Sequence, residues 1–303
     1  MGAGWRLGVR LSPLWRTTRR KTALGFQRGF RITWKQTGLG SDWMIYLTRE
    51  LVEKFQNGEK KLSLDLGRSV TMVTNELDGV PLDEVKGDFV YAWDGEELWK
   101  LAVFDDGLYR LRMMKGKPIL EIDGLRMHLI KEFGDVFDYS ELVVRELKLK
   151  QSDVVLDTCM GLGYTAIAAS RKADRVVAIE LSRAVLAMAK WNPWSRELFE
   201  LDRIEVIEEK SCFDYIREAE NEKFTKVIHD PPRFSNAGEL YSRSFYRELK
   251  RVCKKDALLF HYVGSLGKKK RNIMGEVAKR LEECGWKVLK KDARLQGIVA
   301  KAV

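Results

Sequence analysis

The sequence is poor in the residues that build metal sites and disulfide frameworks. Its 303 residues include only four cysteines and three histidines. The cysteines lie far apart and form no CxxC pair, which argues against a zinc site and favours reduced thiols in a cytoplasmic protein. The chain also lacks an uncharged apolar run of about 18 residues, the length that a membrane-spanning helix needs. We therefore expect no bound metal ion and no membrane partner.

Acidic side chains are almost absent from residues 1–43. This segment carries nine basic side chains against one acidic one, Asp42, and supplies +8 of the total charge of +10. The rest of the chain is nearly neutral, so net charge alone does not indicate nucleic-acid binding. No apolar run in the segment fits a signal peptide. We interpret residues 1–43 as a basic extension that is disordered, or that is not part of the true protein because its start is Met44; a targeting segment is the alternative.

Short apolar runs separated by turn residues follow. Apolar residues at steps of three and four predict a helix over residues 44–55. Asp-Gly sequences separate several of the later runs, as in β-hairpins. The expected strands cover residues 69–74, 89–93, 98–104 and 108–113. We therefore predict a small β-rich domain over residues 44–125.

Strand and helix patterns alternate through residues 126–303. The expected strands cover residues 154–156, 175–179, 204–207, 226–228, 257–262, 287–289 and 297–300. Helices are expected at residues 137–149, 164–171, 182–191, 212–220, 238–252 and 272–284. This alternation predicts an α/β domain with a Rossmann-like, doubly wound, mainly parallel seven-stranded sheet.

A glycine-containing turn follows the first strand of this domain. Asp157 ends the strand, and Gly161 and Gly163 permit a ligand to approach the backbone closely. The third glycine of a dinucleotide fingerprint is missing, and an acid here would repel a pyrophosphate. The acid suits the positively charged sulfonium and amino groups of S-adenosylmethionine. Glu180, at the end of the next strand, can accept hydrogen bonds from ribose hydroxyls, so we predict S-adenosylmethionine as the cofactor.

The candidate reaction centre is the turn Asp230, Pro231 and Pro232, after the fourth strand. Proline has no N–H to donate, so this turn offers carbonyl oxygens and one carboxylate, all of them acceptors. Such a turn can hold an amino group by its hydrogens and direct the nitrogen lone pair at a methyl donor. Catalysis would then rest mostly on positioning, at the sheet edge where ligands bind in this fold.

Together these motifs resemble those of class I methyltransferases. Residues 122–303 are also similar to the predicted archaeal methyltransferase family, through residues 156–167, 192–199, 229–235 and 238–241. The resemblance implies that S-adenosylmethionine is bound by Asp157, Gly161, Gly163 and Glu180. We add Tyr164 and Thr165, which open the next helix, to the expected cofactor-binding residues.

The residues expected to bind substrate lie near the proline turn. Arg233 stands where amino-methylating enzymes usually have an aromatic residue, and Phe234, one position later, could stack on a planar substrate. His261 could reach the site from the neighbouring strand, with core packing as the alternative for it and for His229. The basic run 267–271 could contact RNA phosphates.

These features predict an enzyme that transfers a methyl group from S-adenosylmethionine to an amino nitrogen, with RNA as the substrate. Two alternatives remain open. Aminopropyl transfer from decarboxylated S-adenosylmethionine to a polyamine uses the same fold and should favour a strongly acidic substrate pocket, which Asp157 and Glu180 alone do not decide. A non-catalytic nucleic-acid-binding protein would keep RNA binding when Asp230 is replaced by alanine.

Overall fold

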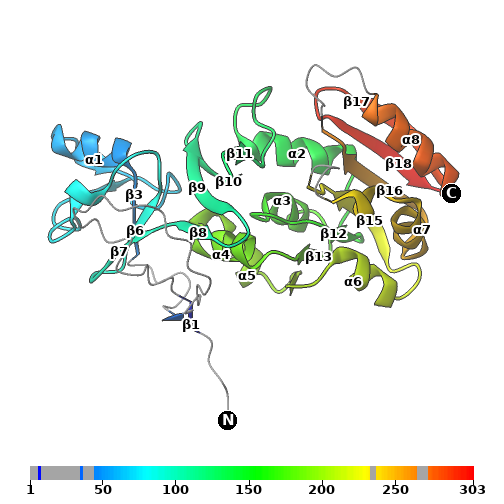
Figure 1. The fold of residues 1–303 in the computed structure, drawn as a ribbon, viewed down its shortest axis with the longest axis horizontal. Coiled ribbons are helices and arrows are strands. Elements are labelled where there is room, and N and C mark those ends of the chain that lie inside the picture. Colours follow the sequence, from blue (N-terminus) through cyan, green and yellow to red (C-terminus); the bar gives the residue numbers. More distant parts are fainter. Residues whose placement is uncertain (1–5, 8–34, 37–43, 233–236, 265–271) are drawn as a thin grey trace, which may run out of the picture. The chain divides into compact units, whose positions relative to one another are not determined.

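The computed structural model describes residues 6–7, 35–36, 44–232, 237–264 and 272–303 (Figure 1). The predicted basic extension, residues 1–43, lies outside the described residues except for two paired strands, β1 (Arg6–Leu7) and β2 (Lys35–Gln36). Contacts divide the chain into two compact units, one of residues 1–127 and 190–196 and one of residues 128–189 and 197–303. Within the described ranges, none of the helices has the length and apolar character needed to cross a membrane.

Short antiparallel strands build the first unit. One sheet has the order β3–β6–β7, a second has the order β11–β10–β9–β8, and β4 pairs with β5. The strands are β3 (Ile45–Leu47), β4 (Lys61–Leu62), β5 (Thr71–Met72), β6 (Tyr91–Trp93), β7 (Leu98–Lys100), β8 (Ala102–Phe104), β9 (Leu108–Met114), β10 (Lys117–Ile122) and β11 (Leu125–Arg126), with helix α1 (Arg49–Gln56) and the 3-10 turn η2 (Leu82–Glu84).

The first predicted helix begins later than residue 44. Residues of β3 pair with β6, so their backbone groups are used in the sheet. The Thr48 hydroxyl accepts a hydrogen bond from the N–H of Leu51 at 3.2 Å and caps the helix start. The prediction over residues 44–55 was therefore wrong at its first turn, because sheet pairing outweighs the apolar spacing there.

The predicted strand over residues 98–104 is two strands with Leu101 between them. The N–H of Leu101 donates to the Val90 carbonyl, and its own carbonyl accepts from the N–H of Leu111. A turn at Lys115 and Gly116, both with positive φ, then leads into β10, which the sequence did not reveal.

Residues 190–196 pack within the first unit, although the sequence placed them in the domain of residues 126–303. The indole N–H of Trp194 donates to the Leu66 carbonyl at 2.9 Å, and the Lys117 ammonium lies 3.7 Å from the centre of the Trp194 ring. Arg68 also donates to the Pro193 carbonyl at 2.8 Å. The segment therefore acts as part of the first unit's packing.

A seven-stranded mixed sheet forms the second unit, with the order β14–β13–β12–β15–β16–β18–β17. The first five strands in this order run parallel, and β18 is antiparallel to both of its neighbours. The strands are β12 (Val154–Asp157), β13 (Arg175–Glu180), β14 (Ile204–Glu208), β15 (Phe224–His229), β16 (Cys253–Tyr262), β17 (Trp286–Asp292) and β18 (Gly297–Ala302). The Rossmann-like α/β class is thus confirmed.

Helices pack on this sheet and connect its strands (Figure 1). They are α2 (Val136–Glu146), α3 (Tyr164–Ser170), α4 (Arg183–Trp191), α5 (Arg196–Glu200), α6 (Cys212–Glu218), α7 (Arg243–Arg251) and α8 (Ile273–Glu283), with the 3-10 turn η4 (Gly238–Tyr241). The 3-10 turn η3 (Pro193–Ser195) belongs to the first unit. Apolar residues of α6, α7 and α8 form one core with the strands. The strand order reverses at β12, between β13 and β15, and such a switch point is where α/β sheets bind ligands.

Candidate active site

A tight glycine turn joins β12 to α3 at the switch point. Gly161 and Gly163 have φ angles of 57° and 79°, in the left-handed region that favours glycine. A Cβ at Gly163 would also lie 2.5 Å from the side chain of Leu198. The carbonyl of Gly163 then accepts the first hydrogen bond of α3, from the N–H of Ile167. The turn therefore requires glycine at both positions.

Asp157 lies at the end of β12 and is fully buried. Its Oδ2 accepts a hydrogen bond from the Thr165 hydroxyl at 2.6 Å, whereas Oδ1 has no hydrogen-bond partner. Burial raises the pKa of Asp157 to about 6, although the hydrogen bond from Thr165 and the nearby N–H of Cys159 favour the carboxylate. A buried acceptor without a partner is costly, so Oδ1 is the atom that a ligand N–H would satisfy.

Glu180 ends β13 beside the same turn. Its Oε2 accepts from the N–H of Gly161 at 3.1 Å, and its Oε1 accepts from the N–H of Ser182 at 2.9 Å. Burial raises the pKa of Glu180 to about 7, against the effect of these N–H groups. Each carboxylate oxygen can accept more than one hydrogen bond, so Glu180 can still receive the ribose hydroxyls for which the sequence proposed it.

Asp230 follows β15, on the other side of Asp157. Asp157 pairs with Ala178 in β13 and with Ile228 in β15, so Glu180 and Asp230 each lie two residues further along their strands. Adjacent strands are about 4.8 Å apart, so the three acids occupy one stretch of sheet edge, here called the carboxylate cluster. Burial, and then the charge of Asp157, raises the pKa of Asp230 to about 7. In the described part of the chain, no lysine or arginine pairs with the cluster.

Tyr139, on α2, joins the cluster, and the sequence did not indicate it. Its side chain is buried and its hydroxyl has no hydrogen-bond partner. Burial and then the charge of Asp230, with smaller effects from Tyr262 and Asp157, raise the pKa of Tyr139 well above its usual value. The available signal was its place on the apolar face of α2, which packing would explain equally well.

The proline turn is held by η4. The Tyr241 hydroxyl donates to the Pro232 carbonyl at 3.1 Å, so one of the two proline carbonyls expected to face a substrate is already engaged. Pro231 is buried, whereas Pro232 is exposed. The predicted substrate-binding residues Arg233 and Phe234, and the basic run 267–271, lie outside the described residues.

His261 is a core residue, contrary to its predicted role in substrate binding. It is fully buried; its Nε2 accepts from the Tyr246 hydroxyl at 2.8 Å, and its Nδ1 donates to the Tyr262 carbonyl at 2.8 Å. Burial, and the neighbouring His229, lower the pKa of His261 well below its usual value. Neither ring nitrogen is left for a substrate, so His261 stabilises the sheet edge from within.

His229 is likewise engaged on both ring nitrogens. The Thr158 hydroxyl lies 2.7 Å from its Nδ1, and its Nε2 donates to the Leu240 carbonyl at 3.1 Å. Burial lowers the pKa of His229 to about 3, so the ring is neutral. His229 therefore connects the turn after β12 to η4, on the strand that carries Asp230.

The two remaining predicted cofactor residues, Tyr164 and Thr165, differ in their contacts. Thr165 contacts Asp157 directly, as described above. Tyr164 is buried, and the centre of its ring lies 4.8 Å from that of Phe137 and 5.5 Å from that of His128.

Cys159, in the glycine turn, has the character of a structural thiol. A hydrogen bond with Cys212, together with burial, raises the pKa of Cys159 well above its usual value. Across the described ranges, no group of three His, Cys, Asp or Glu residues could hold a metal ion.

Comparison with curated proteins places the chain in a family. The Uncharacterized protein MJ1233 of Methanocaldococcus jannaschii is 38% identical over 279 residues, which cover 85% of this chain and 95% of that protein. The chain belongs to the family of this archaeal protein. A shorter similarity, 30% over 94 residues, covers 30% of the chain and 20% of the 23S rRNA (uracil(1939)-C(5))-methyltransferase RlmD of Legionella pneumophila.

Family and structure comparisons point to another group of transferases. The spermine/spermidine synthase domain family matches residues 172–290. A spermidine synthase in complex with the transition-state analogue AdoDATO superposes with a TM-score of 0.54, and that of Thermotoga maritima with 0.52. Each is 16% identical, covering 68% of this chain and 74% of the other.

These comparisons establish a Rossmann-like fold shared with spermidine synthases. They favour the aminopropyl-transfer hypothesis over RNA methylation. The expected membership of the predicted archaeal methyltransferase family stays a prediction, because the family that matches is the spermine/spermidine synthase domain.

Proposed function

We propose that the protein transfers an aminopropyl group from decarboxylated S-adenosylmethionine to an amine of a polyamine. The observation that carries the proposal is the carboxylate cluster, in which Asp157 is buried and Glu180 and Asp230 are half-buried on the adjacent strands. No lysine or arginine is paired to these acids in the described chain. The match to the spermine/spermidine synthase domain supports it, and the matched residues 172–290 include Glu180 and Asp230.

The cluster suits a polycationic acceptor. The raised pKa values mean that burial disfavours the ionised form of each acid. An ammonium group within about 4–6 Å favours the ionised form again. A bound polyamine would therefore provide the positive charge that no side chain of the described chain provides. The unpaired hydroxyl of Tyr139 adds a buried site for a hydrogen bond from the polyamine.

The same cluster explains why the donor would be the decarboxylated form. Intact S-adenosylmethionine carries an additional carboxylate, which would be repelled by the ionised cluster. Two like charges about 5 Å apart repel by about 3 kcal/mol at an effective dielectric of 20. Removing that carboxylate leaves the amino group, which Asp157 can bind through Oδ1, while Glu180 accepts the ribose hydroxyls.

The roles of the residues follow from this arrangement. The donor supplies a carbon made electrophilic by the neighbouring sulfonium. Asp230 accepts the proton that the amine nitrogen loses as it forms the new C–N bond, while the electrons of the broken C–S bond remain on sulfur. A pKa of about 7 suits Asp230 to this role near neutral pH. Tyr139 can accept a second N–H of the amine through its hydroxyl oxygen.

The test is a product assay on the full chain. Each donor, intact or decarboxylated S-adenosylmethionine, is incubated with putrescine, with spermidine or with RNA, and the products are identified by mass spectrometry. We expect methylthioadenosine from the decarboxylated donor and a polyamine. Asp230→Asn should lower the rate by about 100- to 10,000-fold, the range for loss of a general base. Asp174→Asn, an exposed acid at the other end of β13, is the matched control and should be unchanged.

One feature favours a second candidate, methyl transfer to an amino nitrogen of RNA. The Asp230 carboxylate and the Pro231 carbonyl can accept hydrogen bonds from an amino group. The short similarity to an rRNA methyltransferase supports RNA as the substrate class, although the name of that enzyme gives a carbon atom, C5 of uracil, as the methylated position. S-adenosylhomocysteine from the intact donor and RNA would establish this function and contradict aminopropyl transfer. The absence of both products, with RNA binding unaffected by Asp230→Asn, would indicate a non-catalytic nucleic-acid-binding protein.

A further inference from the structure

A second charged site lies at the opposite edge of the same sheet. A cavity of about 610 Å³ opens where β16 begins and β18 ends, beside Cys253 and Ala302. Five cationic side chains line it, against the single acidic side chain of Glu222. We call it the basic cavity; its cations are Arg247, Lys250, Arg251, Lys254 and Lys255.

Most of these cations have no partner in the described chain. Arg251 is engaged, since it donates to the carbonyls of Ala219 and Ile216 and pairs with Glu248 at 2.8 Å. Arg247, Lys250, Lys254 and Lys255 make no hydrogen bond or ion pair with other described residues through their side chains. Four unpaired cations around one cavity repel each other, and an anion bound between them relieves that repulsion.

The backbone makes room for one of these cations. Gly285 has a φ of 83°, and a Cβ there would lie 2.9 Å from Cε of Lys250. The lysine stem therefore packs across the glycine, on the wall of the cavity. Because the contact involves the far end of a flexible side chain, this packing places the ammonium group at the cavity without fixing it there.

The basic cavity is remote from the carboxylate cluster. β16 runs from Cys253, at the cavity, to Tyr262, at the edge that carries Asp230. Its ten residues span about 30 Å at about 3.3 Å per residue. The two sites therefore differ in sign and cannot share one small ligand.

We infer that the basic cavity binds an oligophosphate group, such as the phosphate chain of a nucleotide or inorganic tripolyphosphate. Several negative charges in a row match several cations that have no other partner. Arginine binds phosphate through paired N–H groups and lysine binds it as a point charge. The volume lies within the range of about 300–1,000 Å³ that small-molecule sites occupy. RNA carries the same phosphate chemistry, and the experiment separates the two sources.

The experiment is calorimetric titration of the full chain, at 150 mM salt, with tripolyphosphate, orthophosphate and a single-stranded RNA 12-mer. We expect one tripolyphosphate to bind per chain, with orthophosphate binding more weakly. The double substitution Lys254→Gln and Lys255→Gln affects two exposed side chains, so the fold should be kept. It should weaken tripolyphosphate binding by at least about tenfold, which corresponds to about 1.4 kcal/mol, because charge-assisted hydrogen bonds to the phosphates are lost.

Lys291→Gln is the matched control. Lys291 is an exposed lysine near the far end of β17, and its replacement should leave binding unchanged. The inference is overturned if tripolyphosphate does not bind, if the control loses as much affinity as the double variant, or if RNA binds and tripolyphosphate fails to compete with it.

Discussion

Two buried carboxylates, one in each unit, have pKa values that shift in opposite directions. Glu121, in β10 of the first unit, is 1% exposed, and Asp157, in β12 of the second, is 0% exposed. Burial alone would raise the pKa of both. Hydrogen bonds from Arg112 and Arg110 outweigh burial at Glu121 and lower its pKa, whereas no cation offsets burial at Asp157 and its pKa rises to about 6. The partners, rather than the depth of burial, therefore decide the charge state.

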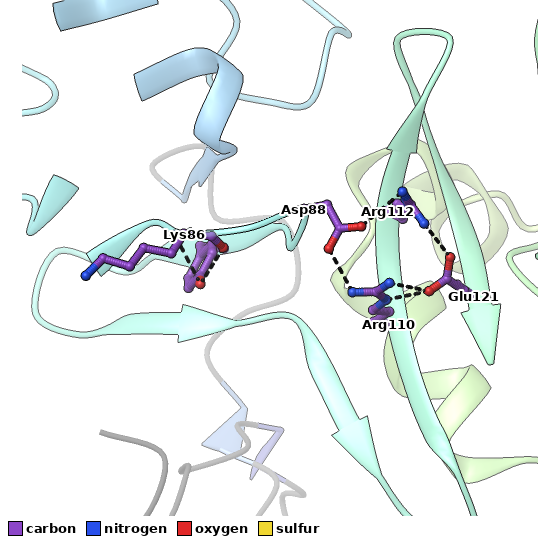
Figure 2. A network of polar contacts seen from close by, with 6 residues as sticks. Lys86, Asp88, Arg110, Arg112 and Glu121 are labelled. Carbon is purple, nitrogen blue, oxygen red and sulfur yellow. Dashed lines mark hydrogen bonds and ion pairs between the residues drawn. The ribbon is translucent and has the colours of Figure 1, made fainter. Parts of the chain in front are cut away.

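Both carboxylate oxygens of Glu121 accept hydrogen bonds (Figure 2). Arg110 donates to its Oε1 at 2.6 Å and Arg112 to its Oε2 at 2.9 Å, and both arginines also pair with Asp88. Asp157, in contrast, keeps one oxygen unpaired. A satisfied buried acid stabilises its unit, while an unsatisfied one retains binding capacity for a ligand. This difference separates a structural carboxylate from a candidate functional one.

The largest effect on stability is expected at Glu121. Glu121→Gln removes the charge that holds two arginines and should lower the free energy of unfolding by about 2–4 kcal/mol, somewhat below the usual loss for a broken buried pair because the arginines reach solvent. Urea denaturation measures the change. The control Glu53→Gln breaks an exposed helical pair with Arg49 and should cost less than about 0.5 kcal/mol. Equal losses of unfolding free energy in the two variants would contradict the expected difference between the buried pairs of Glu121 and the exposed pair of Glu53.

The next effect on stability is expected at Asp230, where a substitution should raise the free energy of unfolding instead of lowering it. Its pKa rises from 3.8 to about 7 on folding, so the folded state binds the proton more tightly and stability is lost as the pH rises through this interval. The full shift corresponds to about 4 kcal/mol, and solvent screening reduces it because Asp230 is half-buried. Asp230→Asn should therefore be more stable than the wild type by about 1–2 kcal/mol at pH 8, with a smaller difference at pH 4.

Urea denaturation at several pH values measures this profile. Glu121→Gln should show the reverse trend, because the lowered pKa of Glu121 gives a stabilisation that is present above the usual pKa and is lost as the pH falls. An Asp230→Asn variant that is less stable than the wild type at pH 8 would show that Asp230 has a stabilising partner.

The sequence predicted the parts of the site that depend on where individual strands end. The apolar runs before Asp157, Glu180 and Asp230 predicted three strand ends, and parallel strands bring such ends to one edge. It did not predict which side chains point into the core. The strand β16 is buried on both faces near its end, where Leu259, Phe260 and His261 are each 0% exposed. Its position next to the edge therefore did not make His261 a substrate ligand.

The sequence failed where distant segments meet. The packing of Trp194 against Leu66 places residues 190–196 in the first unit, and no local pattern encodes that contact. β10 was missed for a similar reason, since its pairing with β9 depends on the turn at Lys115 and Gly116. Tyr139 lies near Asp230 only because α2 packs in the second unit.

The smallest effect on stability is expected at Tyr139. Because its buried hydroxyl has no partner, Tyr139→Phe should leave the free energy of unfolding unchanged or raise it by up to about 1 kcal/mol. The control Tyr246→Phe removes the hydroxyl that donates to Nε2 of His261 at 2.8 Å and leaves a buried acceptor unpaired, at a cost of about 1–3 kcal/mol.

The two substitutions remove the same atom from buried rings. The difference between their stability changes therefore measures what the hydrogen-bond partner of the hydroxyl contributes. Thermal and urea denaturation give the stabilities, and the product assay gives the rate. A Tyr139→Phe variant that keeps its stability but loses activity places the hydroxyl in the carboxylate cluster as a group reserved for a ligand. A loss of stability as large as that of Tyr246→Phe would mean that the hydroxyl already has a partner, and Tyr139 would then belong with Glu121 among the structural polar groups.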